Sequence, residues 1–365
     1  IAEALGMTVP GGASPPAVTA DRMRVAEETG RQAVRIAREG LTIDKILTEK
    51  SLENAMRVLL AIGGSTNGII HLTAIAGRMG FDIDLDALDR MGRHTPVLLD
   101  LKPSGQHYME DFHHAGGMAT LLRELKPLLH LDALTVSGKT LGEEIEAAGP
   151  GFAQDVVKSA AQPIYPQGGI AVLRGNLAPG GAIIKQSAAD ARLMEHEGRA
   201  VVFENIEDLV TRIDRDDLDV TADDILVLKN IGPKGAPGMP EAGYIPIPQK
   251  LARAGVKDMI RISDGRMSGT AFGTIVLHVT PESAVGGPLA YVQNGDRIRL
   301  SVANRALTLL VSEEALNERA INNPVVTPTA DRGYRKLFLD TVMQADKGAD
   351  FDFLRAVENR GKTPK

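Results

Sequence analysis

Residues 263–274 carry the side chains best suited to chemistry. The segment reads Ser-Asp-Gly-Arg-Met-Ser-Gly-Thr-Ala-Phe-Gly-Thr and lies between two short apolar runs, at 259–262 and 275–277. Glycine costs about 1 kcal/mol inside a helix, so this stretch predicts a turn that follows a strand. Hydroxyls, a carboxylate and a guanidinium held on such a turn are typical of catalytic or binding groups. The alternative is a tight turn whose hydroxyls only cap the backbone.

A second loop could hold a cation. Residues 230–241 read Asn-Ile-Gly-Pro-Lys-Gly-Ala-Pro-Gly-Met-Pro-Glu and follow an expected strand at 225–228. The glycines let the backbone approach a ligand closely, and the prolines stiffen the chain before Glu241. A carboxylate in that position suits Mg²⁺, which takes oxygen ligands. The alternative is a solvated surface carboxylate, which is the commoner state of a glutamate.

A third segment, 63–68, reads Gly-Gly-Ser-Thr-Asn-Gly and joins two expected helices. Free backbone N–H groups at the start of the second helix could hold a carboxylate or a phosphate. The segment lacks the lysine of a P-loop and follows no strand, which argues against a nucleotide site. An ordinary capped turn between helices is the alternative. The candidate ligand-binding side chains here are Ser65, Thr66, Asn67 and, one helical turn further, His71.

Two other patterns give weaker predictions. His107, His113 and His114 cluster in the sequence, but their spacing matches no zinc site, so we interpret them as polar loop residues. Ser268 lies between Met267 and Gly269 and lacks the Gly-x-Ser-x-Gly elbow of esterases. A serine hydrolase is therefore a distant alternative.

The elements that must position these groups change in type along the chain. Up to about residue 160 the apolar spacing predicts mainly helices, with one short buried strand at 97–99. After about residue 165 short β-type runs recur between Gly, Pro, Asn and Asp turns, which indicates a β-barrel or sandwich. The expected helices are 20–39, 51–62, 68–79, 84–91, 117–129, 206–213, 247–254 and 332–345. The expected strands are 170–173, 182–184, 200–203, 225–228, 259–262, 274–278, 297–301 and 307–311.

Composition excludes several classes of protein. With 365 residues the chain is long enough for two domains, and its 43% hydrophobic and 24% charged residues are those of a soluble globular protein. A net charge of -6 argues against a nucleic-acid partner. No apolar run approaches the roughly 20 residues that span a bilayer, and the first residues do not resemble a signal peptide, so we expect a cytoplasmic protein without a membrane partner. The chain has no cysteine, so it offers no disulfide, thiolate nucleophile or iron–sulfur ligand.

Taken together, the segments resemble the dihydroxy-acid dehydratase/6-phosphogluconate dehydratase family. The likeness covers nearly the whole chain in the same order, which makes it more specific than any one motif. The residues at 267–270 and the C-terminal stretches at 332–336 and 349–353 look most like the sugar-acid branch, which includes arabinonate and xylonate dehydratases. The other matching segments are 63–68 with His71, 102–105 with Glu110 and Asp111, 238–241, and 263–274.

The resemblance implies an α/β fold in two parts. Residues 1–165 would be the C-terminal part of an N-terminal α/β catalytic domain, of which a helix-rich remainder is present. Residues 166–325 would form a β-barrel-like C-terminal domain with few helices. Residues 326–365 would form a C-terminal helical tail.

The resemblance also implies a hydro-lyase reaction on a small-molecule sugar acid. A 2,3-dihydroxy acid loses the C2 proton and the C3 hydroxyl and gives a 2-keto-3-deoxy acid. Ser268 matches the family's proposed base, which nearby positive charge must activate because a free hydroxyl is a weak acid. Glu241 matches a Mg²⁺ ligand. The residues expected to bind substrate are Thr270, Ser65, Thr66, Asn67, His71 and Arg266.

The chain departs from the family at its cofactors. Family members use Mg²⁺ and a [2Fe-2S] cluster, or in some members a [4Fe-4S] cluster, and three cysteines hold the cluster. This chain has none, and the other Mg²⁺ ligands of the family (two acidic residues and a modified lysine) would precede Ile1. We therefore expect a C-terminal portion of a longer enzyme, inactive by itself and holding Mg²⁺ poorly through Glu241. The family also implies a homodimer or homotetramer.

Two alternative functions stay open at this point. One is a dihydroxy-acid dehydratase of branched-chain amino-acid biosynthesis, which would differ in substrate rather than in chemistry. The other is a non-catalytic fragment or scaffold that kept the fold without the cluster ligands.

Overall fold

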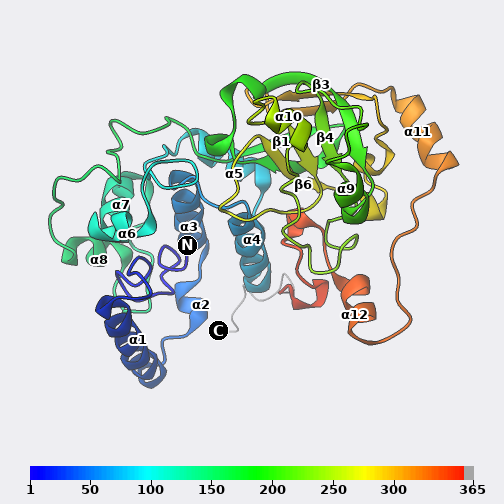
Figure 1. The fold of residues 1–365 in the computed structure, drawn as a ribbon. Helices are drawn as coiled ribbons and strands as arrows, with labels where there is room; N and C mark the ends of the chain where they lie inside the picture. Colours follow the sequence, from blue (N-terminus) through cyan, green and yellow to red (C-terminus); the bar gives the residue numbers. More distant parts are fainter. Residues whose placement is uncertain (357–365) are drawn as a thin grey trace. The chain divides into compact units, whose positions relative to one another are not determined.

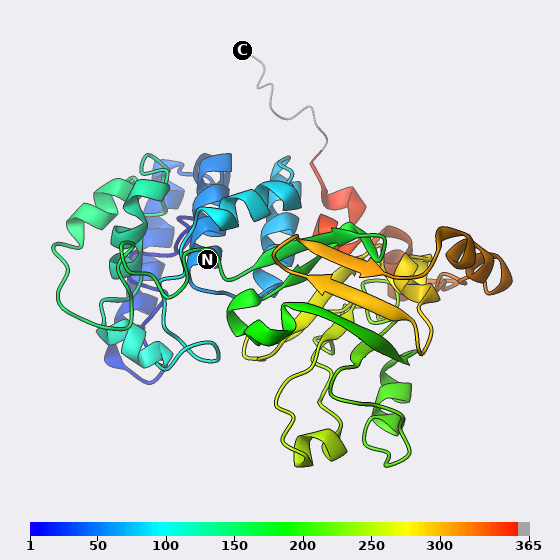
Figure 2. The same ribbon diagram turned by 90° about the horizontal axis from the view of Figure 1, so that it is seen from above.

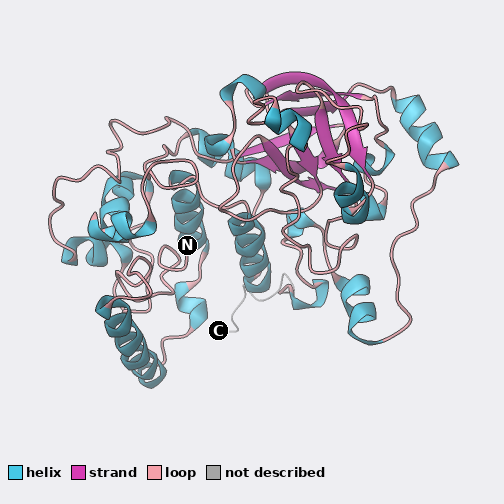
Figure 3. Ribbon diagram, viewed as in Figure 1, coloured by secondary structure: helices cyan, strands magenta, loops and turns pink. Residues whose placement is uncertain are grey.

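The computed structural model describes residues 1–356 of the chain and divides them between two compact units. The helical unit comprises Ile1–Gly64 and Arg90–Gly169, and the barrel unit comprises Ser65–Asp89 and the chain from Ile170 onward. Within the described residues, every named strand lies in the barrel unit, whereas the helical unit consists of helices and loops (Figure 3). The domain limits expected at residues 165 and 325 stay predictions, and residues 357–365 of the expected tail lie outside the described residues.

The helical unit follows the predicted apolar spacing, with a few differences. The helix expected at 20–39 is confirmed with the same bounds, although none of its residues is buried. The expected strand at 97–99 forms only isolated bridges, Val97 to Tyr165 and Leu99 to Val157, because its partners lie in an irregular segment. The helices are α1 (Ala20–Glu39), α2 (Ile43–Ile46), α3 (Glu49–Ala61), α6 (Met109–His114), α7 (Gly117–Leu125) and α8 (Leu141–Ala147), with α5 (Leu85–Arg93) at the boundary between the units (Figure 1).

The barrel unit is built on a closed eight-stranded sheet, so the expected α/β fold with a C-terminal β-barrel is confirmed. Around the barrel the order is β1-β2-β6-β5-β4-β3-β7-β8. The run β3-β4-β5-β6 is parallel, and a parallel β1–β8 bridge closes the sheet. The strands are β1 (Ala171–Gly175), β2 (Ala178–Ile184), β3 (Glu195–Phe203), β4 (Ile225–Leu228), β5 (Arg261–Ser263), β6 (Ile275–Thr280), β7 (Arg297–Ser301) and β8 (Ala306–Leu309).

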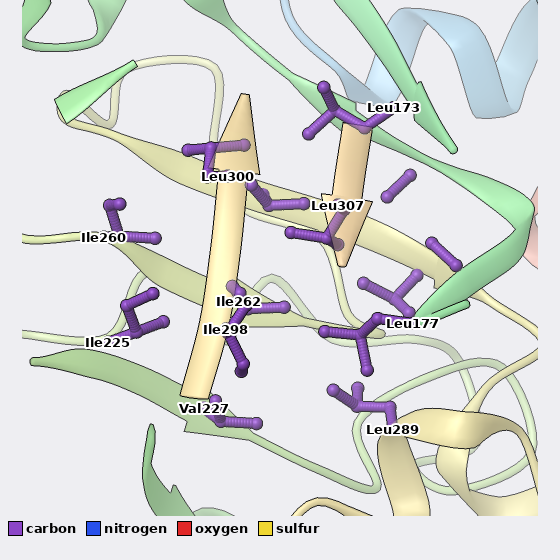
Figure 4. Packing of buried hydrophobic residues seen from close by; sticks show 14 of the residues in the cluster. Leu173, Leu177, Ile225, Val227, Ile260, Ile262, Leu289, Ile298, Leu300 and Leu307 are labelled. Carbon is purple, nitrogen blue, oxygen red and sulfur yellow. The ribbon is translucent and has the colours of Figure 1, made fainter. Parts of the chain in front are cut away.

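The interior of the barrel is a packed aliphatic core. Strand alternation sends every second side chain inward. Ile262 of β5, Ile298 of β7 and Leu307 of β8 are fully buried there, and Figure 4 shows their side chains pointing toward one another. The interior cluster contains only Ala, Val, Leu and Ile, so the barrel is a solid core rather than a channel.

Helices cover parts of the outer wall. In Figure 2, α9 (Ile206–Arg212) and α10 (Gln249–Arg253) lie on the same side of the barrel, where Leu209 and Leu251 pack with outward residues of β3 and β4. The unit also contains α4 (Asn67–Met79), α11 (Glu313–Asn322) and α12 (Gly333–Thr341). Among the described residues, no helix combines the length and apolar character needed to cross a membrane.

The parallel strands place the two glycine-rich loops together. Leu228, the last residue of β4, is in register with Ser263, the last residue of β5. The loop 229–248 leaves the carboxyl end of β4, and the loop 264–274 leaves the carboxyl end of β5. Neighbouring parallel strands end at one edge of a sheet, so both loops start side by side, at the kind of edge where α/β proteins bind ligands.

Candidate active site

One buried carboxylate ties the starts of the two loops together. Asp264 directly follows β5 and is 0% exposed. Its Oδ1 accepts a hydrogen bond from the backbone N–H of Ile231 at 3.0 Å, and its Oδ2 accepts one from Ser283 at 2.8 Å. Burial raises the pKa of Asp264, and the backbone donors oppose that shift. The carboxylate therefore fixes the base of the 264–274 loop at an energetic cost that these two donors offset.

A second buried carboxylate braces the 230–241 loop. Glu282 is 1% exposed and accepts hydrogen bonds from the backbone N–H groups of Lys234, at 2.9 Å, and Gly235, also at 2.9 Å. Gln344 binds it twice, because the amide donates to Oε1 at 2.7 Å and accepts from the Glu282 N–H at 2.9 Å. Burial raises the pKa of this carboxyl as well. The loop that ends at Glu241 is thus held at Lys234 and Gly235.

The hydroxyls of the 264–274 loop lie in its middle, where the chain is open. Ser268 Oγ is 3.0 Å from Thr270 Oγ1. Ser268 is partly exposed and Thr270 is exposed, whereas Met267 beside them is buried against Ile275 and Leu277. The loop is therefore anchored through Met267 and presents two hydrogen-bonded hydroxyls to the outside.

The start of α4 meets both loops. The Asn67 amide Nδ2 donates to the Glu241 carboxylate and to the carbonyl oxygen of Met267, the latter at 3.0 Å. A Cβ on Gly269 would lie 2.9 Å from Cβ of Ser65, so only glycine lets the Ser268 loop approach the helix start this closely. Asn67 Oδ1 is buried and has no hydrogen-bond partner among residues 1–356.

Arg266 and His71 line a pocket of about 330 Å³ whose wall includes part of the 230–241 loop. Arg266 donates through Nε to the carbonyl oxygen of Met239, which holds its guanidinium against the 230–241 loop. His71 is exposed on α4. Arg78 and Asp350, joined by two hydrogen bonds of 2.7 Å, form a further part of the pocket wall. The pocket thus offers one guanidinium not paired to a carboxylate, one imidazole and one ion pair.

His278 of β6 lies behind the turn at the start of the 264–274 loop. Its backbone is left-handed, with φ of 57°, and its N–H donates to the carbonyl oxygen of Gly265 at 3.0 Å. The side chain is 4% exposed, and its Nε2 has no partner in the described part of the chain. Burial, together with the charge of Arg266, lowers its pKa from 6.5 to about 3, so the ring is neutral near pH 7. No periodicity in the sequence predicted this residue's environment.

The side chains fit part of a Mg²⁺ site and no part of an iron–sulfur site. The Glu241 carboxylate and the unpartnered amide oxygen of Asn67 are hard oxygen donors of the kind Mg²⁺ prefers. They fall short of an octahedral set, and residues 1–356 hold no group of three His, Asp or Glu side chains arranged for a metal. A cluster needs thiolates, which this chain lacks.

The structure brings the predicted site residues into one unit. Asn67 contacts Glu241 and the Ser268 loop, Gly269 closes on Ser65, and Arg266 shares a pocket with His71. Thr66 is buried, and its Oγ1 is unpartnered within the described range. The histidines expected to be polar loop residues lie in the helical unit, where His113 contacts Ser14 at 3.2 Å and Asp21 at 3.4 Å. The roles assigned to the predicted site residues stay predictions.

Comparison with known proteins identifies the family. Residues 1–144 match the model of the dihydroxy-acid/6-phosphogluconate dehydratase N-terminal domain. Residues 155–349 match the model of the corresponding C-terminal domain. The second match begins at residue 155, shortly before the helical unit ends at Gly169.

Relatives of several named activities match nearly the whole chain. An L-arabonate dehydratase of Azospirillum brasilense is 48% identical over 363 residues, which are 97% of this chain and 62% of that protein. A 6-deoxy-6-sulfo-D-gluconate dehydratase of Pseudomonas putida is 46% identical over 361 residues, 98% of this chain and 62% of that protein. A dihydroxy-acid dehydratase of Methanothrix thermoacetophila is 41% identical over 352 residues, which are 95% of this chain and 64% of that protein. The chain therefore spans less than two thirds of these relatives, and it belongs to the dihydroxy-acid/6-phosphogluconate dehydratase family.

Proposed function

We propose that this chain carries the barrel part of a hydro-lyase that converts a 2,3-dihydroxy sugar acid to a 2-keto-3-deoxy acid. The observation that carries the proposal is the junction at Asn67, whose amide binds both Glu241 and the backbone of Met267, next to Ser268. The Asn67 side chain thereby holds the Glu241 carboxylate, which could bind a cation, next to the loop that carries the Ser268 hydroxyl, the candidate base. A tight turn with capping hydroxyls would not need the Glu241 loop beside it.

The reaction asks the protein to remove a proton next to a carboxylate. In the proposed reaction the C2–H bond breaks, its electron pair forms the C2–C3 double bond, and the C3–O bond breaks. The C3 hydroxyl takes up a proton from the solvent and leaves as water, and the enol then becomes the 2-keto acid by moving its hydroxyl proton to C3 through the solvent. Ser268 Oγ receives the C2 proton. For this it must act as an alkoxide, which requires positive charge nearby; the hydroxyl of Thr270, 3.0 Å away, would add one hydrogen bond to that charge.

Glu241 and Asn67 would form part of the binding site for Mg²⁺, which when bound would supply Lewis-acid stabilisation of the charge that develops on the substrate carboxylate. Asn67 orients the Glu241 carboxylate, while the Glu282 brace keeps the loop in place. Arg266 and His71 line the adjoining pocket and would contact the hydroxyls of the acid, together with Ser65 and Thr66 at the helix start. No step is assigned to an iron–sulfur cluster, for which this chain has no ligand.

A sugar acid is the preferred substrate class because relatives 46–48% identical bear sugar-acid dehydratase names, while the dihydroxy-acid dehydratase is 41% identical. Dihydroxy-acid dehydration is the second candidate. The cytoplasmic location, the homodimer or homotetramer and the inactivity of this chain by itself stay predictions.

The test is formation of 2-keto acid from a panel of sugar acids and 2,3-dihydroxy-isovalerate by the natural protein that contains this chain. Ser268→Ala should lower kcat by about a thousandfold, as loss of a base does, while thermal stability stays near that of the parent. Ser312→Ala, which removes only the hydroxyl cap of α11, is the matched control and should leave kcat unchanged. Retained turnover in Ser268→Ala would remove this residue from the role of base.

A further inference from the structure

The pocket of about 330 Å³ takes part of its wall from each of the three elements that form the candidate site. One wall residue comes from α4 and one from each loop, all within four positions of Asn67, Glu241 or Ser268, namely His71, Met239 and Arg266. The Asn67 amide joins the two loops, because it binds Glu241 and the carbonyl oxygen of Met267. The pocket therefore adjoins the loop that carries Ser268.

The fold holds His71 in place on α4. His71 follows Asn67 by four residues, so the two side chains lie on one face of the helix, about one turn apart. Ile70 beside it is buried and packs with Met239 and Ala345. The helix is thus fixed at the turn that carries His71, whereas the His71 side chain itself is exposed and lines the pocket.

Among the described residues of the pocket wall, His71 is the one whose side-chain type exchanges a proton near neutral pH. The other ionisable side chains of the wall are Arg78, Asp350 and Arg266. The hydrogen bonds between Arg78 and Asp350 raise the pKa of the arginine and lower that of the aspartate, so both stay charged. A guanidinium keeps its proton in proteins, whereas an imidazole gains and loses one between about pH 5 and 8.

The proposed reaction requires a proton at C3. After water has left, the enol has a hydroxyl on C2 and a double bond between C2 and C3. The product has two hydrogens on C3, of which one was there in the substrate and the other must be delivered. Water can deliver it to either face of the enol, whereas a fixed side chain delivers it to one face.

We propose that His71 delivers this proton to C3 from the α4 wall of the pocket, so that the new hydrogen enters one face of the enol. The inference rests on the proposed function, because it takes the enol as given. The imidazolium N–H bond breaks, and the π electron pair of C2 and C3 forms the new C3–H bond with that proton. The enol O–H bond breaks, its electron pair completes the C2–O double bond, and its proton passes to the solvent. The solvent then protonates the exposed imidazole again.

Deuterium labelling tests the proposal. The natural protein that contains this chain converts, in D₂O, the sugar acid that it turns over fastest. Hydrogen peroxide, added at once, converts the 2-keto acid to the acid one carbon shorter and stops exchange at the former C3. Proton NMR then measures deuterium in the two positions on that carbon. The parent should favour one position at least about tenfold, because a positioned acid outcompetes water by such a factor, and His71→Gln should label both nearly equally.

The variants separate proton delivery from binding and folding. His71→Gln keeps a hydrogen-bonding side chain at an exposed position, so KM and the melting temperature should change little. Its kcat should fall about tenfold, less than in Ser268→Ala, because water can still protonate the enol. His71→Asn should lose the deuterium preference in the same way. His130→Gln is the matched control, since His130 lies in the helical unit with its ring on Glu53 at 2.6 Å, and it should keep the preference of the parent.

The outcomes distinguish this inference from the proposed function. A deuterium preference in His71→Gln equal to that of the parent would overturn the inference, also where KM rises, because His71 would then only bind the acid. Equal labelling by the parent, or complete loss of 2-keto acid in His71→Gln, would overturn it too. In each of these cases 2-keto acid formation by the parent leaves the proposed function standing. If the parent forms no 2-keto acid from any acid of the panel, both fail.

Discussion

The interior of the barrel and the covered part of its outer wall are equally buried but differ in chemistry. The interior cluster among the described residues consists of aliphatic side chains. Outside that cluster, strand ends and loops bury side chains that can carry charge, namely Lys185, Asp264, His278 and Glu282.

The aliphatic residues contribute mainly to stability, whereas the buried ionisable residues point to function. Aliphatic burial stabilises the barrel in proportion to the area removed from water. Buried ionisable groups cost free energy unless they are paired, and proteins hold such groups where binding or catalysis needs them. Asp264 and Glu282 meet that cost by accepting backbone hydrogen bonds, whereas His278 Nε2 has no partner among residues 1–356.

The largest effect is expected from the interior. Leu300→Ala removes a fully buried side chain of β7 and should lower the free energy of unfolding by about 3 kcal/mol. Thr308→Ala, on the opposite face of the neighbouring strand β8, should cost about 1 kcal/mol or less. Urea unfolding of both variants measures the difference. Equal losses would contradict the distinction between the two faces.

The next effect belongs to the outer wall and depends on pH. Folding lowers the pKa of His278 from 6.5 to about 3, so below pH 6.5 the unfolded chain binds a proton that the folded chain does not. Stability should therefore fall as the pH drops, by about 2 kcal/mol at pH 5 from this group alone.

His278→Asn tests that expectation, because asparagine tolerates the left-handed backbone and does not titrate. Unfolding at pH 7.5 and at pH 5 should show a smaller pH dependence in this variant than in the parent. An unchanged dependence would assign the acid sensitivity to other groups. Arg266 is the charged group that acts on His278, so Arg266→Gln should raise the histidine's pKa slightly.

A smaller effect is expected at the junction of the two loops. Asn67→Ala removes the amide that binds Glu241 and Met267, so the Mg²⁺ concentration for half-maximal activity should rise about tenfold, or about 1.4 kcal/mol. Asn176→Ala is the control, because that amide bridges backbone groups of Leu309 away from the proposed site. It should lower stability and leave the Mg²⁺ requirement unchanged. If both variants required the same Mg²⁺ concentration, Asn67 would have no part in binding the metal.

The smallest effect is expected where the outer wall is open to water. Glu197 of β3 binds Arg297 and Arg299 of β7 at 3.1 Å and 2.8 Å, and all three side chains are partly or largely exposed. Solvent screens such pairs, so Arg299→Ala should leave the urea midpoint within experimental error. A clear loss of stability in Arg299→Ala that disappears at high salt would contradict this expectation. It would show that charged side chains on the exposed part of the wall also stabilise the fold.

Much of the fold follows from local sequence patterns. The helix at 20–39 and the strands at 225–228 and 297–301 have the predicted bounds, because period and turn residues agree there. The helix α8 was not predicted, although Thr140 and Glu143 form a capping box that is visible in the sequence. The expected strand at 97–99 failed because a strand requires a regular partner, and that partner is distant in the sequence.

The sequence alone determined which residues could do chemistry and in which loops they lie, since glycine, proline and hydroxyl spacing is a local property. Only the tertiary structure decided that Asn67 reaches Glu241 across 174 positions and Met267 across 200. It also decided that the amine of the buried Lys229 binds Glu204 and the carbonyl oxygen of Ala290. Strand order and register set these relations, and the closing of a barrel depends on contacts between residues far apart in the chain.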